Sequence, residues 1–243
     1  MTSSNPPSSK QLLLLSPGFL LIDKPLDLTS NQVVQKLKRK IQRGTKIGHA
    51  GTLDPKASGL VLIGISREYT KQFSKLIKED KEYIAWVDLS GTSETDDLEG
   101  PIEHPDEFDI DQMKISDKIP TINEIQTILD KKFVGVITQI PSKYSAIKIK
   151  QPESKSKRAY QLAREGVEFE VHSRQITIHQ IEIIEYQYPI LKLKIECSSG
   201  TYIRTLGHDI GRSLGLGGYL TYLRRTKIGK YNIENAHKLY EFD

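Results

Sequence analysis

The spacing of apolar and polar residues predicts strands over much of the chain. The strand-like runs are 18–24, 60–65, 81–90, 168–171, 175–184 and 190–197. In 190–197 (ILKLKIEC) apolar and charged residues alternate, as in a strand with one buried face. By contrast, 60–65 (LVLIGI) has no charged residue, which suits a strand that is buried on both faces.

Helices are indicated by capping signals and by a wider apolar spacing. Thr29 with Gln32, and Thr121 with Glu124, have the three-residue spacing of a capping box at a helix start. The expected helices begin after these two threonines and also cover 68–77, 160–164, 201–214 and 220–225. Strands and helices are interleaved, so we predict an α+β fold with one mixed, mostly antiparallel sheet flanked by helices.

The length of 243 residues suits one large domain or two small ones. Residues 1–16 are expected to be a disordered leader, because the chain begins with the polar, Ser- and Pro-rich run MTSSNPPSSK. Residues 17–243 are predicted to form a single domain.

Charge is distributed unevenly, although the net charge is only +4. Basic residues concentrate in 36–46, 143–158 and 224–230, and acidic residues in 94–109. Each block alone is typical of a solvated surface. Their segregation, however, favours a face that binds a polyanion such as RNA.

Several classes of site are excluded or disfavoured. Cys197 is the only cysteine, which excludes an intrachain disulfide or a Cys-based zinc site. The histidines lack metal-ligand spacing, and the glycine motifs that cradle nucleotide phosphates are missing, so neither metal nor cofactor is expected. No export or anchor signal is found, so we predict a cytoplasmic location.

One carboxylate stands out in the stretch KIGHAGTLDPKASG. Residues 28–53 hold many basic side chains and no Asp or Glu, and Asp54 follows them directly. A carboxylate that faces RNA repels phosphate, so it must be used in chemistry or paired with a cation. Arg204, in GTYIRTLGHDIG, is the candidate partner, since an arginine would keep Asp54 ionised for nucleophilic attack. Most Asp residues in loops have a structural role, so the contact between Asp54 and Arg204 is an expectation at this point.

Other candidates are weaker when each is taken alone. Tyr83 and Tyr202 could stack on an extruded base, although aromatic residues in strands more often belong to the core. His49 could contact RNA, and Lys24 could simply end a strand.

Taken together, the motifs resemble those of the TruB-type tRNA pseudouridine synthases. They are, in order, LLIDKP, GHAGTLDPKASGLVLIGI, REYTK, KEYIAWVDLSG, QIPSKYSAIK, AREG, SSGTYIRTL and YLRRTKIG, from about residue 18 to 229. The order of G-x-L-D-P, G-T-Y-I-R and L-R-R is specific to this family. The resemblance implies the pseudouridine synthase fold, with a central RNA-binding cleft.

The resemblance also implies a reaction and a site. The family isomerises the T-loop uridine at position 55 of tRNA to pseudouridine, without cofactor or metal, after flipping the base from its stack. By motif, the catalytic residues would be Asp54, Tyr83 and Arg204. The substrate-binding residues would be His49, Tyr202, Leu223 and Lys24. The carboxylate would attack either the uracil ring or the anomeric carbon of the ribose, and the sequence leaves both open.

Several departures from the family pattern are visible, among them the following two. Glu94 stands where the family tends to have Asp, and only about fourteen residues follow Gly229. We therefore expect a catalytic domain without the C-terminal RNA-binding domain of the PUA type, acting as a monomer on the T arm and elbow of tRNA.

Three other functions are alternatives to this one. A non-catalytic RNA-binding or tRNA-folding module would share the basic surface but not need Asp54. A related synthase could act on another uridine, in rRNA or one chosen by a guide RNA. An unrelated Asp-dependent hydrolase lacks support, because no partner carboxylate, triad or metal spacing accompanies Asp54.

Overall fold

The computed structural model describes residues 15–104, 119–149 and 156–242. Most of the predicted leader, residues 1–14, lies outside the described residues, as do 105–118 of the acidic block and 150–155 of the second basic block.

One sheet of ten strands runs through the molecule in the order β14-β1-β3-β12-β4-β11-β10-β7, with β2 paired to β3 and β13 to β12. Its strands are β1 (Gly18–Lys24), β2 (Ile47–Ala50), β3 (Ala57–Ile65), β4 (Lys81–Asp88), β7 (Gly135–Gln139), β10 (Arg174–Gln187), β11 (Ile190–Cys197), β12 (Tyr219–Ile228), β13 (Tyr231–Asn232) and β14 (His237–Lys238). The pairs β1–β14 and β3–β12 are parallel and the others antiparallel. The predicted mixed, mostly antiparallel sheet is confirmed.

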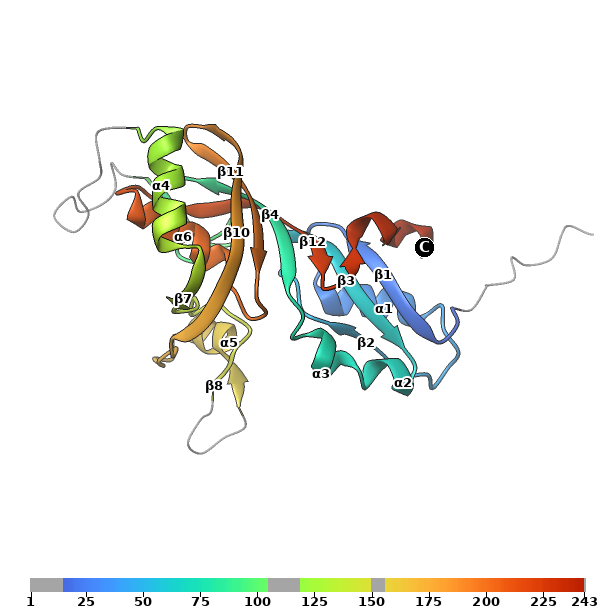
Figure 1. The fold of residues 1–243 in the computed structure, drawn as a ribbon. Coiled ribbons are helices and arrows are strands. Elements are labelled where there is room, and N and C mark those ends of the chain that lie inside the picture. Colours follow the sequence, from blue (N-terminus) through green and yellow to red (C-terminus); the bar gives the residue numbers. More distant parts are fainter. Residues whose placement is uncertain (1–14, 105–118, 150–155, 243) are drawn as a thin grey trace, which may run out of the picture.

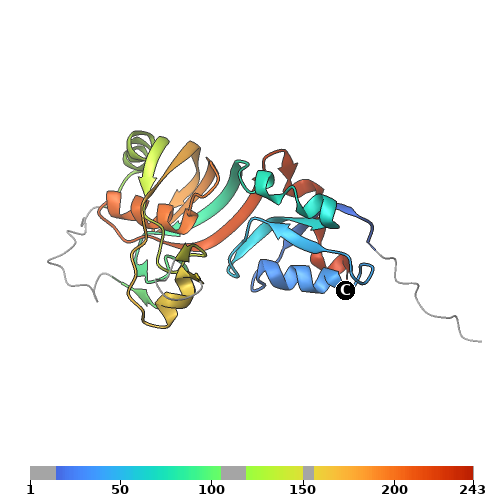
Figure 2. The same ribbon diagram turned by 90° about the horizontal axis from the view of Figure 1, so that it is seen from below.

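The sheet runs through two lobes, and helices lie beside it in each (Figure 1). The helices are α1 (Ser30–Lys38), α2 (Arg67–Thr70), α3 (Phe73–Leu76), α4 (Ile122–Lys132), α5 (Ala159–Arg164), α6 (Ile203–Ser213), η2 (Ile233–Asn235) and η3 (Leu239–Phe242). One lobe holds β1, β2, β3, α1, α2 and α3, and the other holds α4, α5 and α6 beside β7, β10 and β11. Figure 2 shows an elongated molecule in which β4 and β12 pass from one lobe to the other. Two short hairpins stand apart from the sheet, β5 (Thr92–Ser93) with β6 (Ile102–Glu103) and β8 (Lys148–Ile149) with β9 (Lys157–Arg158).

The apolar run in β3 is buried on both faces, as its composition predicts. Val61 and Ile63 belong to the main core, while Leu60 and Leu62 belong to a second cluster with Leu76 of α3. All four strand residues are 0% exposed, so β3 provides a rigid base for the loop that precedes it.

Both predicted capping boxes are present and begin α1 and α4. The helix expected at 68–77 is two short helices, α2 and α3. The strand expected at 168–171 is wrong, because this segment lies outside every strand. The sequence pattern also missed β2 and β7, which are only four and five residues long.

The helix expected at 220–225 is wrong as well. These residues belong to β12, which pairs with β4 along its length and with β3 at Leu223–Arg225. Leu220 and Leu223 have helical spacing, but pairing with neighbours on both sides overrides this local preference. The difference matters because β12 joins the two lobes and carries Leu223 into the site.

Candidate active site

The loop that carries Asp54 connects β2 to β3 and is held by buried polar contacts. The Ser30 hydroxyl, at the start of α1, accepts from the Leu53 N–H at 2.8 Å and donates to the Leu53 carbonyl at 3.2 Å. On the other side of Asp54, the Pro55 carbonyl accepts from the Asp27 N–H at 2.8 Å. These contacts fix the backbone on both sides of the carboxylate.

A buried arginine also binds the backbone of the same loop. Arg225, only 2% exposed, donates to the carbonyls of Gly51 at 3.1 Å and Leu60 at 2.8 Å. Close by, Gly59 has φ +107°, and a Cβ there would lie 2.3 Å from the Arg225 carbonyl oxygen. Glycine is therefore required where β3 meets β12.

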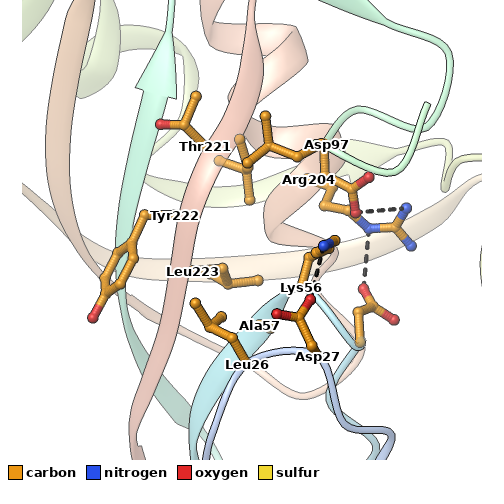
Figure 3. A pocket seen from close by; sticks show the side chains of 12 residues that line it. Leu26, Asp27, Lys56, Ala57, Asp97, Arg204, Thr221, Tyr222 and Leu223 are labelled. Atoms are coloured by element: carbon orange, nitrogen blue, oxygen red, sulfur yellow. Dashed lines mark hydrogen bonds and ion pairs between the residues drawn. The ribbon is translucent and has the colours of Figure 1, made fainter. Parts of the chain in front are cut away.

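Arg204 brings Asp54 together with a second carboxylate. Its Nε lies 3.1 Å from Asp54 Oδ2, and its Nη1 lies 3.5 Å from Asp97 Oδ2. The guanidinium also donates to the Thr95 carbonyl at 2.7 Å and the Tyr144 carbonyl at 3.1 Å. Figure 3 shows Arg204 and Asp97 side by side. The contact between Asp54 and Arg204 expected from the sequence is therefore present in the structure.

Charge and burial reinforce this arrangement. Burial alone would lower the pKa of Arg204, but the carboxylates of Asp54 and Asp97 outweigh it and raise the pKa. Burial also raises the pKa of Asp96 to about 6, although Arg204 opposes the shift. The side chain of Asp54 is 39% exposed, whereas that of Arg204 is 8% exposed, so the acid reaches solvent and the base stays covered.

The Asp54–Arg204 pair borders a cavity of about 140 Å³ between the lobes. Its apolar wall is formed by Leu26, Ala57 and Leu223, which lie across from Arg204 in Figure 3. A charged group thus faces an apolar surface, which is the usual make-up of a small-molecule or nucleobase pocket.

The other predicted residues lie around this cavity without lining it. Tyr83 of β4 is 8% exposed and belongs to the main core, and burial raises the pKa of its hydroxyl. Tyr202 precedes α6 and lies under the Arg174 guanidinium, 5.5 Å from the ring centroid. His49 lies in β2, where burial and the charge of Arg225 lower its pKa.

Lys24 lies beneath the Asp54 loop. Its ammonium group donates to the carbonyls of Pro25, Leu28 and Pro55 at 2.9, 2.7 and 3.4 Å, and the residue is 0% exposed. Burial lowers its pKa to about 8, while the charge of Asp54 opposes the shift. The structure therefore gives Lys24 a role in holding this loop, and direct contact with substrate stays a prediction.

Two residues of the site were not singled out from the sequence as site residues. Asp97 was read as part of an acidic loop, yet it is 5% exposed and paired with Arg204. Arg225 was counted within a basic block, yet it is buried under the Asp54 loop. In the sequence, Arg225 is marked by being the second arginine of the L-R-R motif, and Asp97 by its place in the same family pattern from which Glu94 departs.

Within the described residues, no cluster of three or more His, Cys, Asp or Glu side chains could hold a metal ion. No helix in this part of the chain is long and apolar enough to cross a membrane.

The fold is that of the pseudouridine synthases. A solved structure described as "Structure of H/ACA RNP bound to a substrate RNA containing 2'-deoxyuridine" contains a chain that superposes with a TM-score of 0.63 and 25% identity over 92% of this chain. The "Crystal structure of the archaeal box H/ACA sRNP Nop10-Cbf5 complex" gives a TM-score of 0.62 at 25% identity over 93% of this chain. This chain spans about half the length of those two chains, 51% and 52%.

Within that class, the chain belongs to the TruB family of pseudouridylate synthases. The N-terminal domain model of the family matches residues 38–203, and a model described as the tRNA pseudouridylate synthase B C-terminal domain matches 204–243. The resemblance found in the sequence is confirmed.

Relatives named tRNA pseudouridine synthase B share much of the sequence. The protein from Nitrosospira multiformis is 44% identical over 91% of this chain and 67% of its own length. The one from Desulfotalea psychrophila is 41% identical over 90% of this chain and 85% of its own length.

Proposed function

We propose that this chain is a tRNA pseudouridine synthase that isomerises the T-loop uridine at position 55 to pseudouridine. Family membership and the names of the relatives support the reaction class and the tRNA substrate. The observation that carries the proposal is the ion pair between Asp54 and Arg204, at 3.1 Å, on the border of a cavity with an apolar wall.

Asp54 is the nucleophile in this proposal. Its carboxylate attacks either C6 of the uracil or C1′ of the ribose, and the N1–C1′ bond breaks. The base then turns, a C5–C1′ bond forms, and the bond to Asp54 breaks. C5 then loses its proton and N1 gains one, which restores the ring, so the product is an isomer of the substrate.

Arg204 holds the Asp54 carboxylate. The guanidinium is only 8% exposed and donates to two backbone carbonyls, so it stays in place when RNA binds. The Asp54 carboxylate is therefore kept oriented toward the cavity. The apolar side chains of Leu26 and Leu223 would contact the flipped base.

The two tyrosines do not line the cavity, and we propose that they act on the base from positions next to its lining. Because burial raises the pKa of Tyr83, its phenol stays neutral at pH 7 and suits a role in orienting the base. Tyr202 is proposed to bind substrate beside Arg204, and His49 to contact the RNA near the Asp54 loop.

The proposed partner is the T arm and elbow of tRNA. Exposed basic residues of the described part of the chain would contact its phosphates, namely Arg39, Arg43 and Lys46 after α1, and Lys148, Lys157 and Arg158 in β8 and β9. The proposal also includes that the protein acts as a monomer without a protein partner. It further includes a single catalytic domain and a cytoplasmic location.

Site mapping tests the proposed target. Wild-type protein is incubated with a tRNA transcript, and pseudouridine is mapped by carbodiimide adducts and primer extension. We expect one product, at position 55, and no product in a transcript with cytidine there. Pseudouridine at another position would refute the assignment of the target uridine.

A further inference from the structure

Gln139 makes two hydrogen bonds to a single residue of the active site. It is the last residue of β7 and is 1% exposed. Its amide oxygen accepts from the Tyr202 N–H at 2.8 Å, and its amide nitrogen donates to the Tyr202 carbonyl at 3.0 Å. Both polar ends of the amide are thus used on one backbone unit, two residues before Arg204.

The N-cap residue of α6 is anchored by this contact from outside the helix, and the helix has no side-chain cap of its own. Tyr202 is its N-cap residue and makes no side-chain capping bond, whereas α1 and α4 begin with complete capping boxes. The Tyr202 carbonyl accepts the first bond of the helix, from the Leu206 N–H at 3.0 Å. Gln139 binds that same carbonyl from outside, so the residue at which α6 begins is tied to the end of β7.

The segment that begins at Gln139 touches the site a second time. Five residues on, the Tyr144 carbonyl accepts from Arg204 Nη2 at 3.1 Å. The Tyr144 hydroxyl donates to Glu94 at 2.5 Å, and the Thr95 carbonyl next to Glu94 accepts from Arg204 Nη1. Residues 139–144 therefore contact both the Tyr202 backbone at the start of α6 and the guanidinium of Arg204 in its first turn.

A neighbour of Gln139 fixes the side chain of the residue that Gln139 binds. Arg174 of β10 is its register partner on the adjacent strand, and the Arg174 guanidinium lies over the Tyr202 ring at 5.5 Å. The backbone and the ring of Tyr202 are thus held by one pair of facing residues at the end of β7.

We propose that Gln139 is a positioning residue for the isomerisation, acting through the Tyr202 backbone to keep Arg204 against Asp54. This inference rests on the proposed function. Its consequence is that movement at the root of the 140–149 segment, where RNA would bind, changes the geometry of the Asp54–Arg204 pair.

The test begins with Gln139→Met, which keeps the size of the side chain and removes both hydrogen bonds. Gln175→Met is the matched control, because Gln175 is exposed and opposite Thr138 on the same strand pair. Single-turnover tritium release gives the rate, and filter binding gives the Kd for tRNA. We expect the Gln139 variant to lose at least about tenfold in rate, with Kd within twofold, and the control to match wild type.

A double variant separates positioning from a general structural role. If Gln139 acts through Arg204, adding Gln139→Met to Arg204→Lys costs little beyond Arg204→Lys alone. Losses that multiply, a weakened Kd, or a wild-type rate for Gln139→Met would each overturn the proposal. If Gln139→Met does not fold, Gln139→Glu is used in the same cycle, since it retains an acceptor for the Tyr202 N–H and faces Arg174.

The experiment also distinguishes a failure of the proposed function from a failure of the positioning role. Wild type that binds tRNA but releases no tritium refutes the activity, and the positioning role is then judged by NMR. The Arg204 Nε–H resonance must shift in Gln139→Met and stay unchanged in Gln175→Met. An unchanged resonance in both variants would overturn the positioning role.

Discussion

Replacing Arg204 with methionine removes the group that organises the site. Methionine fills part of the same volume but has no charge and no donor. The substitution leaves the carboxylates of Asp54 and Asp97 without their cation, and the carbonyls of Thr95 and Tyr144 without a donor. Both folding and catalysis should therefore suffer.

The size of the effect on folding follows from burial. Removing one partner of a buried ion pair costs about 3–5 kcal/mol. Asp97 keeps bonds from the Thr95 hydroxyl at 2.7 Å and the Glu99 N–H at 2.9 Å, which favours the lower end of that range. The pair with the more exposed Asp54 adds only about 0–1 kcal/mol. A loss of about 3 kcal/mol lowers the Tm by about 6–12 °C in a chain of this size.

The effect on catalysis should be of similar size in free energy, since Asp54 loses the contact that aims it. We expect a rate lower by on the order of a hundredfold, measured by single-turnover tritium release below the Tm of the variant. Arg212→Met is the control, because Arg212 is exposed on the same helix. Its Tm and rate should stay near wild type. An Arg204→Met rate within threefold of wild type, or an unchanged Tm, would refute the reasoning.

Three further substitutions test other parts of the account. Asp97→Asn removes one charge beside Arg204, so we expect about tenfold slower turnover with an unchanged Kd for tRNA; an equal rate would show that the second carboxylate is dispensable. Burial lowers the pKa of Lys81 to about 8, below its ordinary 10.5, so the unfolded chain holds this proton longer and the free energy of unfolding rises with pH between those values. Denaturant titrations of Lys81→Met at pH 7.5 and 9.5 should show less of that rise, and the same rise as in wild type would contradict the assignment. Gly59→Ala places a Cβ 2.3 Å from the Arg225 carbonyl oxygen at φ +107°, so thermal unfolding should show a loss of more than about 2 kcal/mol; a wild-type Tm would mean that β3 and β12 can separate there.

The elements predicted well from sequence are those with local causes. The alternation in 190–197 predicts β11 with its bounds, and the capping boxes predict the starts of α1 and α4. A capping box needs only residues three apart, so no distant contact is required to form it. The same holds for β3, whose apolar run reflects two buried faces.

Elements with distant causes were misjudged. β12 is a strand because β3 and β4 lie on either side of it, although 220–225 has an apolar spacing that also fits a helix. β7 is short, and its position is determined by pairing with β10. Neither partner can be identified from the spacing of residues within the segment itself.

The site shows the same division. Asp54 and Arg204 could be singled out because a lone acid after a basic segment needs a cation. The hydrogen bonds from Arg204 to the carbonyls of Thr95 and Tyr144 could not be predicted from the sequence. Every residue has a backbone carbonyl, so such contacts do not depend on residue type. The same is true of the backbone bonds made by Gln139.

The most direct test of the central claim compares wild type with Asp54→Asn on one substrate. Tritium release is measured from a T-arm stem-loop that carries C5-tritiated uridine, with RNA binding measured in parallel. The account predicts release by wild type, none by Asp54→Asn, and similar binding by both. Full turnover by Asp54→Asn would contradict the assigned nucleophile, and binding without release by wild type would indicate an RNA-binding module or a different target uridine.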